Sequence, residues 1–168
     1  MPFNIPLPIS FINSEKSFEE NKENYSLNGL IYKHFPEESL YVLKYNKNKA
    51  DINNAYIGMC RGLVVCDKTN KVVAIPPRKS IGFPQFLHIT TNVPELKNEL
   101  TCEEFIEGTN VNVFFHENSW KLSTRSTVGA NTSYDSTKTF RELFMECLQF
   151  DLDKLDRDYC YNFVFQHP

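Results

Sequence analysis

The chain has 168 residues, of which 41% are hydrophobic and 14% are aromatic. This composition excludes a disordered chain and supports one packed domain of ordinary size, or a part of a larger one. The formal net charge of −3 gives no overall signature of polyanion binding, although a local basic groove can lie on an acidic protein.

The first part of the chain predicts a polar extension that precedes the sheet. Residues 13–28, NSEKSFEENKENYSLN, are polar and charged, which indicates a surface helix or a mobile stretch. Phe18 and Tyr25 lie seven residues apart, and this spacing favours the helix because it puts both rings on one face. We therefore expect residues 1–39 to form an N-terminal polar or helical extension and residues 40–168 to form the main domain.

Strand patterns begin at LYVLKY (40–45), after which NKNKADINN reads as a solvated loop. GLVVC (62–66) and KVVAIP (71–76) are β-branched runs joined by the short polar turn DKTN. This arrangement predicts a β-hairpin. Pro76-Pro77 ends the second strand, because proline has no N–H to donate to a strand ladder.

The next part of the chain predicts a loop and then further strands. FPQFLHI (83–89) is expected within the loop. Three runs look like strands: EEFIEG (103–108), NVNVFF (110–115) and WKLSTR (120–125). In NVNVFF the valines alternate with asparagines, as on a strand with one apolar face. HENS joins this strand to WKLSTR as a second hairpin.

Residues 137–150 predict a helix, because apolar residues recur there at helical spacing. These residues are Phe140, Leu143, Phe144, Cys147 and Leu148. Thr139 and Glu142 can form a capping box, and an alternative start lies a turn earlier at Asp135 or Ser136. YCYNFVF (159–165) then reads as a strand. The pattern as a whole indicates an α+β fold, with mainly antiparallel sheet and packed helices.

The cysteines and the hydropathy pattern point to the inside of the cell. The five cysteines form no C-x-x-C pair and no zinc spacing, so we expect free thiols in a reducing compartment. The start, MPFNIPLPISF, is a poor signal peptide because it has three prolines and no basic flank. No apolar run approaches the roughly 20 residues that span a bilayer. We expect a soluble, cytoplasmic protein without a membrane partner.

Four stretches follow one another in the order found in a known enzyme family: CRGLVV (60–65), FPQFLHI (83–89), FIEGT (105–109) and YNFVFQHP (161–168). The first resembles the Arg-Gly strand upstream of the nucleophile of RNA ligases. The second resembles their Phe-Pro-Lys-Phe-Phe-Asn segment, with Gln85 where lysine is usual. FIEGT falls at motif I, Lys-any-Asp-Gly-Ser/Thr, and YNFVFQHP is similar to motif III, whose aromatic residue stacks on the purine. From about residue 40 onward, the chain thus resembles RNA ligases of the phage T4 RNA ligase 1 type.

The resemblance implies a ligase-like nucleotidyltransferase domain that takes part in RNA repair. In such ligases a lysine attacks the α-phosphate of ATP with the help of Mg²⁺, and the AMP then passes to a 5′-phosphate end of RNA. Here the lysine position is Phe105, which has no lone pair to offer. The chain also ends before motifs IV and V, so we expect an incomplete domain. Lys79 and Lys121 are the nearest substitute amines, although each also reads as a surface lysine.

The resemblance implies a nucleotide pocket formed by Arg61, Glu107, Gly108, Thr109, Arg125, Phe163 and Phe165. Each of these residues also has a structural interpretation. Glu107-Gly108-Thr109 can be a turn, Arg61 an ion-pair partner and Arg125 a residue of an exposed strand. Phe163 and Phe165 can both belong to the core.

Three functions remain open from the sequence. They are an RNA ligase-like domain that binds ATP and RNA ends, a catalytically inactive nucleotide- or RNA-binding module, and a purely structural or interaction domain. Phe105 separates the first function from the second, because an active ligase needs a lysine elsewhere.

Overall fold

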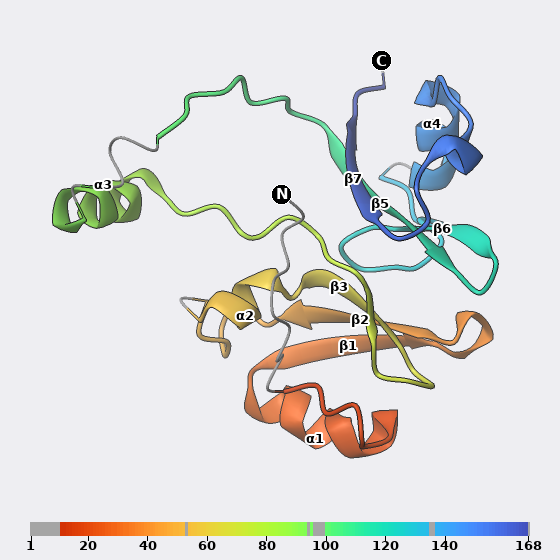
Figure 1. Ribbon diagram of the computed structural model, residues 1–168, viewed down its shortest axis with the longest axis horizontal. Coiled ribbons are helices and arrows are strands. Elements are labelled where there is room, and N and C mark those ends of the chain that lie inside the picture. Colours follow the sequence, from red (N-terminus) through yellow and green to blue (C-terminus); the bar gives the residue numbers. More distant parts are fainter. Residues whose placement is uncertain (1–10, 53, 94, 96–99, 135–136, 168) are drawn as a thin grey trace.

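The computed structural model describes residues 11–52, 54–93, 95, 100–134 and 137–167 (Figure 1). Its helices are α1 (Phe18–Leu27), α2 (Ala55–Met59), α3 (Phe83–Asn92) and α4 (Phe140–Cys147). Its strands are β1 (Leu30–Phe35), β2 (Leu40–Tyr45), β3 (Arg61–Cys66), β4 (Val72–Ala74), β5 (Thr109–His116), β6 (Ser119–Ser123) and β7 (Cys160–Phe165).

The strands form two antiparallel sheets. One sheet has the order β1-β2-β3-β4, and the other has the order β6-β5-β7. Figure 1 shows α1 and α2 beside the first sheet and α4 beside the second. The expected mainly antiparallel sheet structure is confirmed, both predicted hairpins are present, and α1 and α4 pack against the sheets, whereas α3 lies apart from them (Figure 1). The sequence pattern did not separate the strands into two sheets.

Helix α1 covers the outer face of the first sheet. Ser17 and Glu20 form a capping box that starts the helix. Phe18 and Tyr25, whose spacing predicted the helix, are both buried. The hydroxyl of Tyr25 lies 2.7 Å from that of Tyr41 on β2, so the buried rings also satisfy each other's polar atoms.

The inner face of the first sheet packs against the second sheet. Leu40, Val42 and Val64 point inward and form one apolar cluster with Phe114 from β5. On β5, Val111 and Val113 point the opposite way, toward Phe144 of α4 and its apolar neighbours. Because side chains alternate along a strand, the asparagines of NVNVFF share the inner face with Phe114.

Helix α4 begins as expected, at the cap Thr139 with its partner Glu142. It spans Phe140–Cys147, which is shorter than the predicted range 137–150. The alternative start at Asp135 or Ser136 lies outside the described residues.

Two expectations about secondary structure are wrong. FPQFLHI lies in helix α3 rather than in a loop, because Pro84 in the first turn is compatible with a helix. EEFIEG has strand-like composition, but residues 103–107 pair with no strand. By contrast, the loop expected after LYVLKY is present, since residues 46–52 and 54 lie outside helices and strands; Asn54 then caps helix α2, which was not anticipated.

Strand β1 was not anticipated, and it lies inside the expected extension of residues 1–39. It pairs with β2 over its whole length, from Leu30 opposite Tyr45 to Phe35 opposite Leu40. The division of the chain between residues 39 and 40 stays a prediction. None of the helices in the described part of the chain has the length and apolar character needed to cross a bilayer.

Candidate functional site

A cavity of about 380 Å³ brings together parts of the chain that are far apart in the sequence. Its wall consists of Arg61, Pro76, Pro77, Phe105, Ile106, Glu107, Gly108, Asn110, Arg125 and Val164. The volume falls within the roughly 300–1,000 Å³ of typical small-molecule sites. Four of the residues predicted to form a pocket therefore line one cavity: Arg61, Glu107, Gly108 and Arg125.

Gly62 lets strand β3 approach the segment that carries Arg125. Its φ is +114°, a backbone conformation that residues with a side chain rarely adopt. A Cβ at this position would lie 2.8 Å from the Cα of Arg125. The Arg-Gly step thus has a structural reason, because the glycine permits the close approach that brings Arg61 and Arg125 to one cavity.

Gly108 permits a similar close approach, between the start of β5 and strand β7. A Cβ there would lie 2.5 Å from the carbonyl oxygen of Phe165 and 2.9 Å from a methyl group of Val164. The side-chain amide of Gln166 donates a hydrogen bond of 2.8 Å to the backbone oxygen of Glu107. Thr109 follows as the first residue of β5, opposite Phe165, and does not line the cavity. The Glu-Gly-Thr step therefore joins the start of β5 tightly to β7.

The cavity wall carries two guanidinium groups without carboxylate partners. Among the described residues, neither Arg61 nor Arg125 forms a salt bridge. The guanidinium of Arg125 stands 5.6 Å from the ring centre of Tyr45. Lys44, opposite Arg61 in the sheet, donates a hydrogen bond of 3.2 Å to the hydroxyl of Ser126. Among the described wall residues, the two arginines outnumber the one carboxylate, Glu107, which suits an anionic ligand.

Asparagines from β5 extend this polar region between the sheets. Asn110 lines the cavity, and Asn112 lies two residues further along the same face. The amide nitrogen of Asn112 donates to the hydroxyl of Ser123 at 3.2 Å. Its buried amide oxygen has no hydrogen-bond partner among the described residues. Valines on the opposite face alternate with these polar groups, so the strand separates an apolar core from a polar inner surface.

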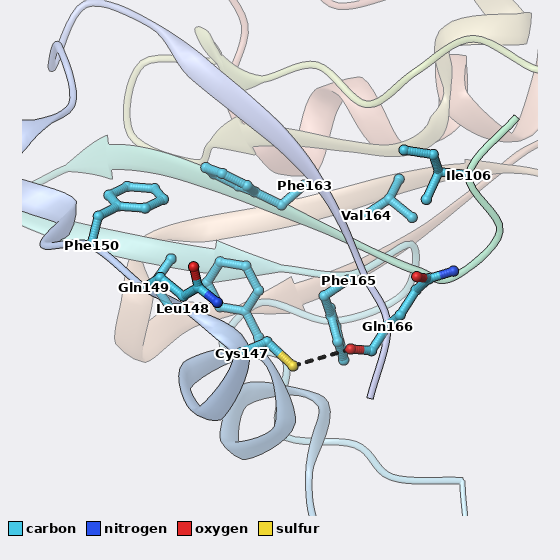
Figure 2. A pocket seen from close by; sticks show the side chains of 10 residues that line it. Ile106, Cys147, Leu148, Gln149, Phe150, Phe163, Val164, Phe165 and Gln166 are labelled. Carbon is cyan, nitrogen blue, oxygen red and sulfur yellow. Dashed lines mark hydrogen bonds between the residues drawn. The ribbon is translucent and has the colours of Figure 1, made fainter. Parts of the chain in front are cut away.

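Phe163 and Phe165 lie elsewhere, and the prediction that one of them shares the cavity with Arg61 is wrong. Both rings pack against Phe144 of α4, with ring centres 5.6 Å and 5.9 Å away, respectively. Figure 2 shows them lining a different, largely apolar pocket beside α4. Val164, which lies between them on β7, lines both that pocket and the cavity of Arg61. The core interpretation of the two phenylalanines is the one that the structure supports.

Phe105, the residue predicted to stand at the position of the family's lysine, lies at the cavity, and 88% of its surface is exposed. Neither Lys79 nor Lys121 lines the cavity. The ammonium group of Lys121 lies 2.6 Å from a carboxylate oxygen of Glu38. Gln85 belongs to α3 and is also absent from the wall. The described wall of the cavity thus contains no amine that could serve as a nucleophile.

Among the described residues, no three His, Cys, Asp or Glu side chains gather as a metal site would require. No family model matches the chain, and no solved structure matches it.

One curated relative connects the chain to nucleic-acid ligases. It comes from Autographa californica nuclear polyhedrosis virus and is described as "Putative bifunctional polynucleotide kinase/RNA ligase". The two sequences are 27% identical over 128 residues. The match covers 71% of this chain but 18% of the viral protein, so the chain spans less than a fifth of its relative's length. The similarity supports a distant RNA ligase-like relationship.

Proposed function

We propose that this chain is an RNA ligase-like nucleotidyltransferase domain of the phage T4 RNA ligase 1 type. It binds ATP and the phosphorylated ends of RNA in the cavity between the two sheets. The observation that carries the proposal is the pair of arginines, Arg61 and Arg125, which meet at one cavity and form no salt bridge with any described carboxylate. The distant relationship to the viral protein supports the choice of nucleic acid over other anions.

The wall residues have complementary tasks in this proposal. Arg61 and Arg125 bind phosphate oxygens through paired N–H groups, which suit phosphate geometry. Asn110 offers both a donor and an acceptor to the sugar or the base. Glu107 is the carboxylate of the described wall. One carboxylate together with the phosphates of a nucleotide is a usual set of Mg²⁺ ligands, so Glu107 fits a Mg²⁺ that arrives with ATP. Such an ion neutralises phosphate charge when it is bound.

The second candidate function is a catalytically inactive nucleotide- or RNA-binding module. Phe105 favours it, because a phenylalanine at the cavity cannot attack phosphorus. Lys79 and Lys121 lie outside the described wall of the cavity, so neither is a ready substitute. Both candidates require the same binding site, and they differ only in whether a covalent AMP intermediate forms. Residues 40–168 carry the motifs of the proposed domain.

A binding experiment tests the site. Calorimetric titrations with ATP and with a short 5′-phosphorylated RNA should show binding to the unaltered chain. Arg61→Ala and Arg125→Ala should each weaken it by about 10- to 100-fold, the usual value of hydrogen bonds to charged groups. Binding should also weaken as the salt concentration rises, because phosphate contacts release counterions. Titrations with DNA of the same sequence and with RNA that lacks the 5′-phosphate show whether the ribose and the 5′-phosphate are recognised.

Arg157→Ala is the matched control. Arg157 is an exposed arginine whose guanidinium stands 4.5 Å from the ring centre of Phe115, and it does not line the cavity. Its removal changes the net charge by the same amount and should leave the affinity unchanged. Equal losses in all three variants would indicate nonspecific attraction to positive charge and would contradict the proposed site.

A further inference from the structure

Phe105 is an exposed aromatic residue whose position the fold does not explain. Its exposure of 88% is greater than that of the other two strongly exposed aromatic residues, Phe83 and Tyr134. Those two pack against neighbouring rings, Phe83 near Phe86 and Tyr134 edge-on to Phe140. In the described part of the chain, Phe105 pairs with no ring. Its ring therefore contributes little to the stability of the folded chain.

The surroundings of Phe105 combine apolar and cationic groups. Phe105 lines the same cavity as Arg61 and Arg125, with Pro76-Pro77 and Val164 as further apolar surface. A phosphate alone would need the arginines but not the ring. An apolar peptide would need the ring but would leave two guanidinium groups desolvated without an anion. A ligand with a flat ring at one end and a phosphate at the other satisfies both kinds of group.

We propose that Phe105 is a stacking platform for the base of a 5′-phosphorylated nucleoside whose phosphate lies on Arg61 and Arg125. The inference rests on the proposed function and adds that the base of the ligand is recognised as well as its phosphate. Aromatic side chains hold bases in this way with little dependence on sequence, because every base has a π-face. In this view the residue at the nucleophile position holds the base of the nucleotide whose α-phosphate a lysine there would attack. The ligand is a free nucleotide or the 5′-terminal nucleotide of a strand.

The test uses a base-bearing and a base-free ligand. Calorimetry with AMP and with ribose 5-phosphate compares the unaltered chain with Phe105→Ala, Phe105→Leu and Phe105→Trp. Loss of one stacked base should weaken the binding of AMP by about 5- to 150-fold in Phe105→Ala. Phe105→Leu should weaken it similarly, because leucine keeps apolar volume without a π-face, and Phe105→Trp should retain it. Binding of ribose 5-phosphate should stay the same in all variants.

Phe83→Ala is the control for the loss of an exposed phenylalanine. Phe83 is exposed on α3 and does not line the cavity, so its removal should not change either affinity. A short 5′-phosphorylated RNA distinguishes the two sources of the nucleoside. Tighter binding of the RNA than of AMP, lost in Phe105→Ala, assigns the platform to a strand end. The reverse order assigns it to a free nucleotide.

The outcomes separate this inference from the proposed function. Unchanged binding of AMP in Phe105→Ala, together with weakened binding in Arg61→Ala, would overturn the stacking platform and leave the phosphate site intact. Equal losses for AMP and ribose 5-phosphate in Phe105→Ala would mean that the ring only shapes the cavity, and would also overturn the inference. Absence of binding of every phosphorylated ligand to the unaltered chain would overturn the proposed function itself.

Discussion

At the scale of single residues, two glycines determine how closely the walls of the cavity approach each other. Gly62 allows β3 to pass next to the backbone of Arg125, and Gly108 allows the start of β5 to pass next to Phe165. The two positions require glycine for different reasons. Gly62 needs both a positive φ and free space, whereas only the lack of space excludes a side chain at Gly108. A side chain at Gly62 therefore disturbs both the local backbone and the cavity.

Gly62→Ala should destabilise the protein by about 1–3 kcal/mol, because the alanine takes a strained φ and its Cβ meets the backbone of Arg125. Urea denaturation measures the change. Gly58→Ala is the control, since Gly58 lies in α2 and a Cβ there would be 3.7 Å from the nearest atom, the oxygen of Ile52. Alanine favours a helix, so this control should be neutral or stabilising by up to about 1 kcal/mol. Equal stability of the two variants would refute this account of Gly62.

At the scale of elements, the sequence predicts those helices and strands whose signals are local. α1 and α4 combine a capping box with apolar spacing, and both are present. β1 was missed because, as an edge strand, it exposes three consecutive residues and shows no alternation. EEFIEG has the composition of a strand but finds no partner strand, and pairing is a tertiary property that composition cannot give.

The cap of α4 predicts a pH dependence of stability. The backbone N–H of Thr139 donates a hydrogen bond of 2.7 Å to the carboxylate of Glu142, and the Thr139 hydroxyl adds a second. These hydrogen bonds lower the pKa of Glu142 below its ordinary value. Because the pKa of Glu142 is lower in the folded state than in the unfolded state, its ionised form stabilises the fold. This stabilisation is complete above the unfolded-state pKa, about 4.3 for glutamate. This contribution is lost as the pH falls from there through the lower folded value.

Thermal unfolding of Glu142→Gln between pH 3 and pH 6 tests this dependence. Glutamine can still accept the hydrogen bonds but has no charge to lose, so the variant's melting temperature should fall less on acidification than that of the unaltered chain. Glu23→Gln, at an exposed position of α1, removes one carboxylate elsewhere and serves as the control. If both variants respond to acid alike, the cap is not the source of the difference.

At the scale of the whole molecule, the site depends on the docking of two sheets. The ordered motifs indicated which residues would gather, and Arg61, Glu107, Gly108 and Arg125 do line one cavity. The sequence could not indicate which face of β7 meets that cavity. Alternation shows that Phe163 and Phe165 share a face, but the packing of α4 decides that this face is the core. The role of each wall residue stays a prediction.

Incubation with radiolabelled ATP and Mg²⁺ should give no covalent protein–AMP with the unaltered chain, because an aromatic ring cannot attack phosphorus. Phe105→Lys supplies an amine, yet we expect little adduct. A lysine nucleophile is activated by desolvation or by neighbouring charges that lower its pKa, and this position is 88% exposed. Phe105→Ala serves as the control for loss of the ring. A labelled adduct on the unaltered chain, mapped to Lys79 or Lys121, would reveal a relocated nucleophile.

The cavity has a thermodynamic consequence because both sheets contribute to its wall. Arg61 comes from one sheet and Val164 from the other, so a chain whose sheets have separated has no binding site. By mass action, a ligand that binds only the docked form stabilises it, by about 2.7 kcal/mol at a hundred times its dissociation constant. Conversely, a substitution at Phe114, buried between the sheets, would weaken the apparent affinity without touching the ligand. Ligand affinity and conformational stability are therefore linked through one equilibrium, the docking of the sheets.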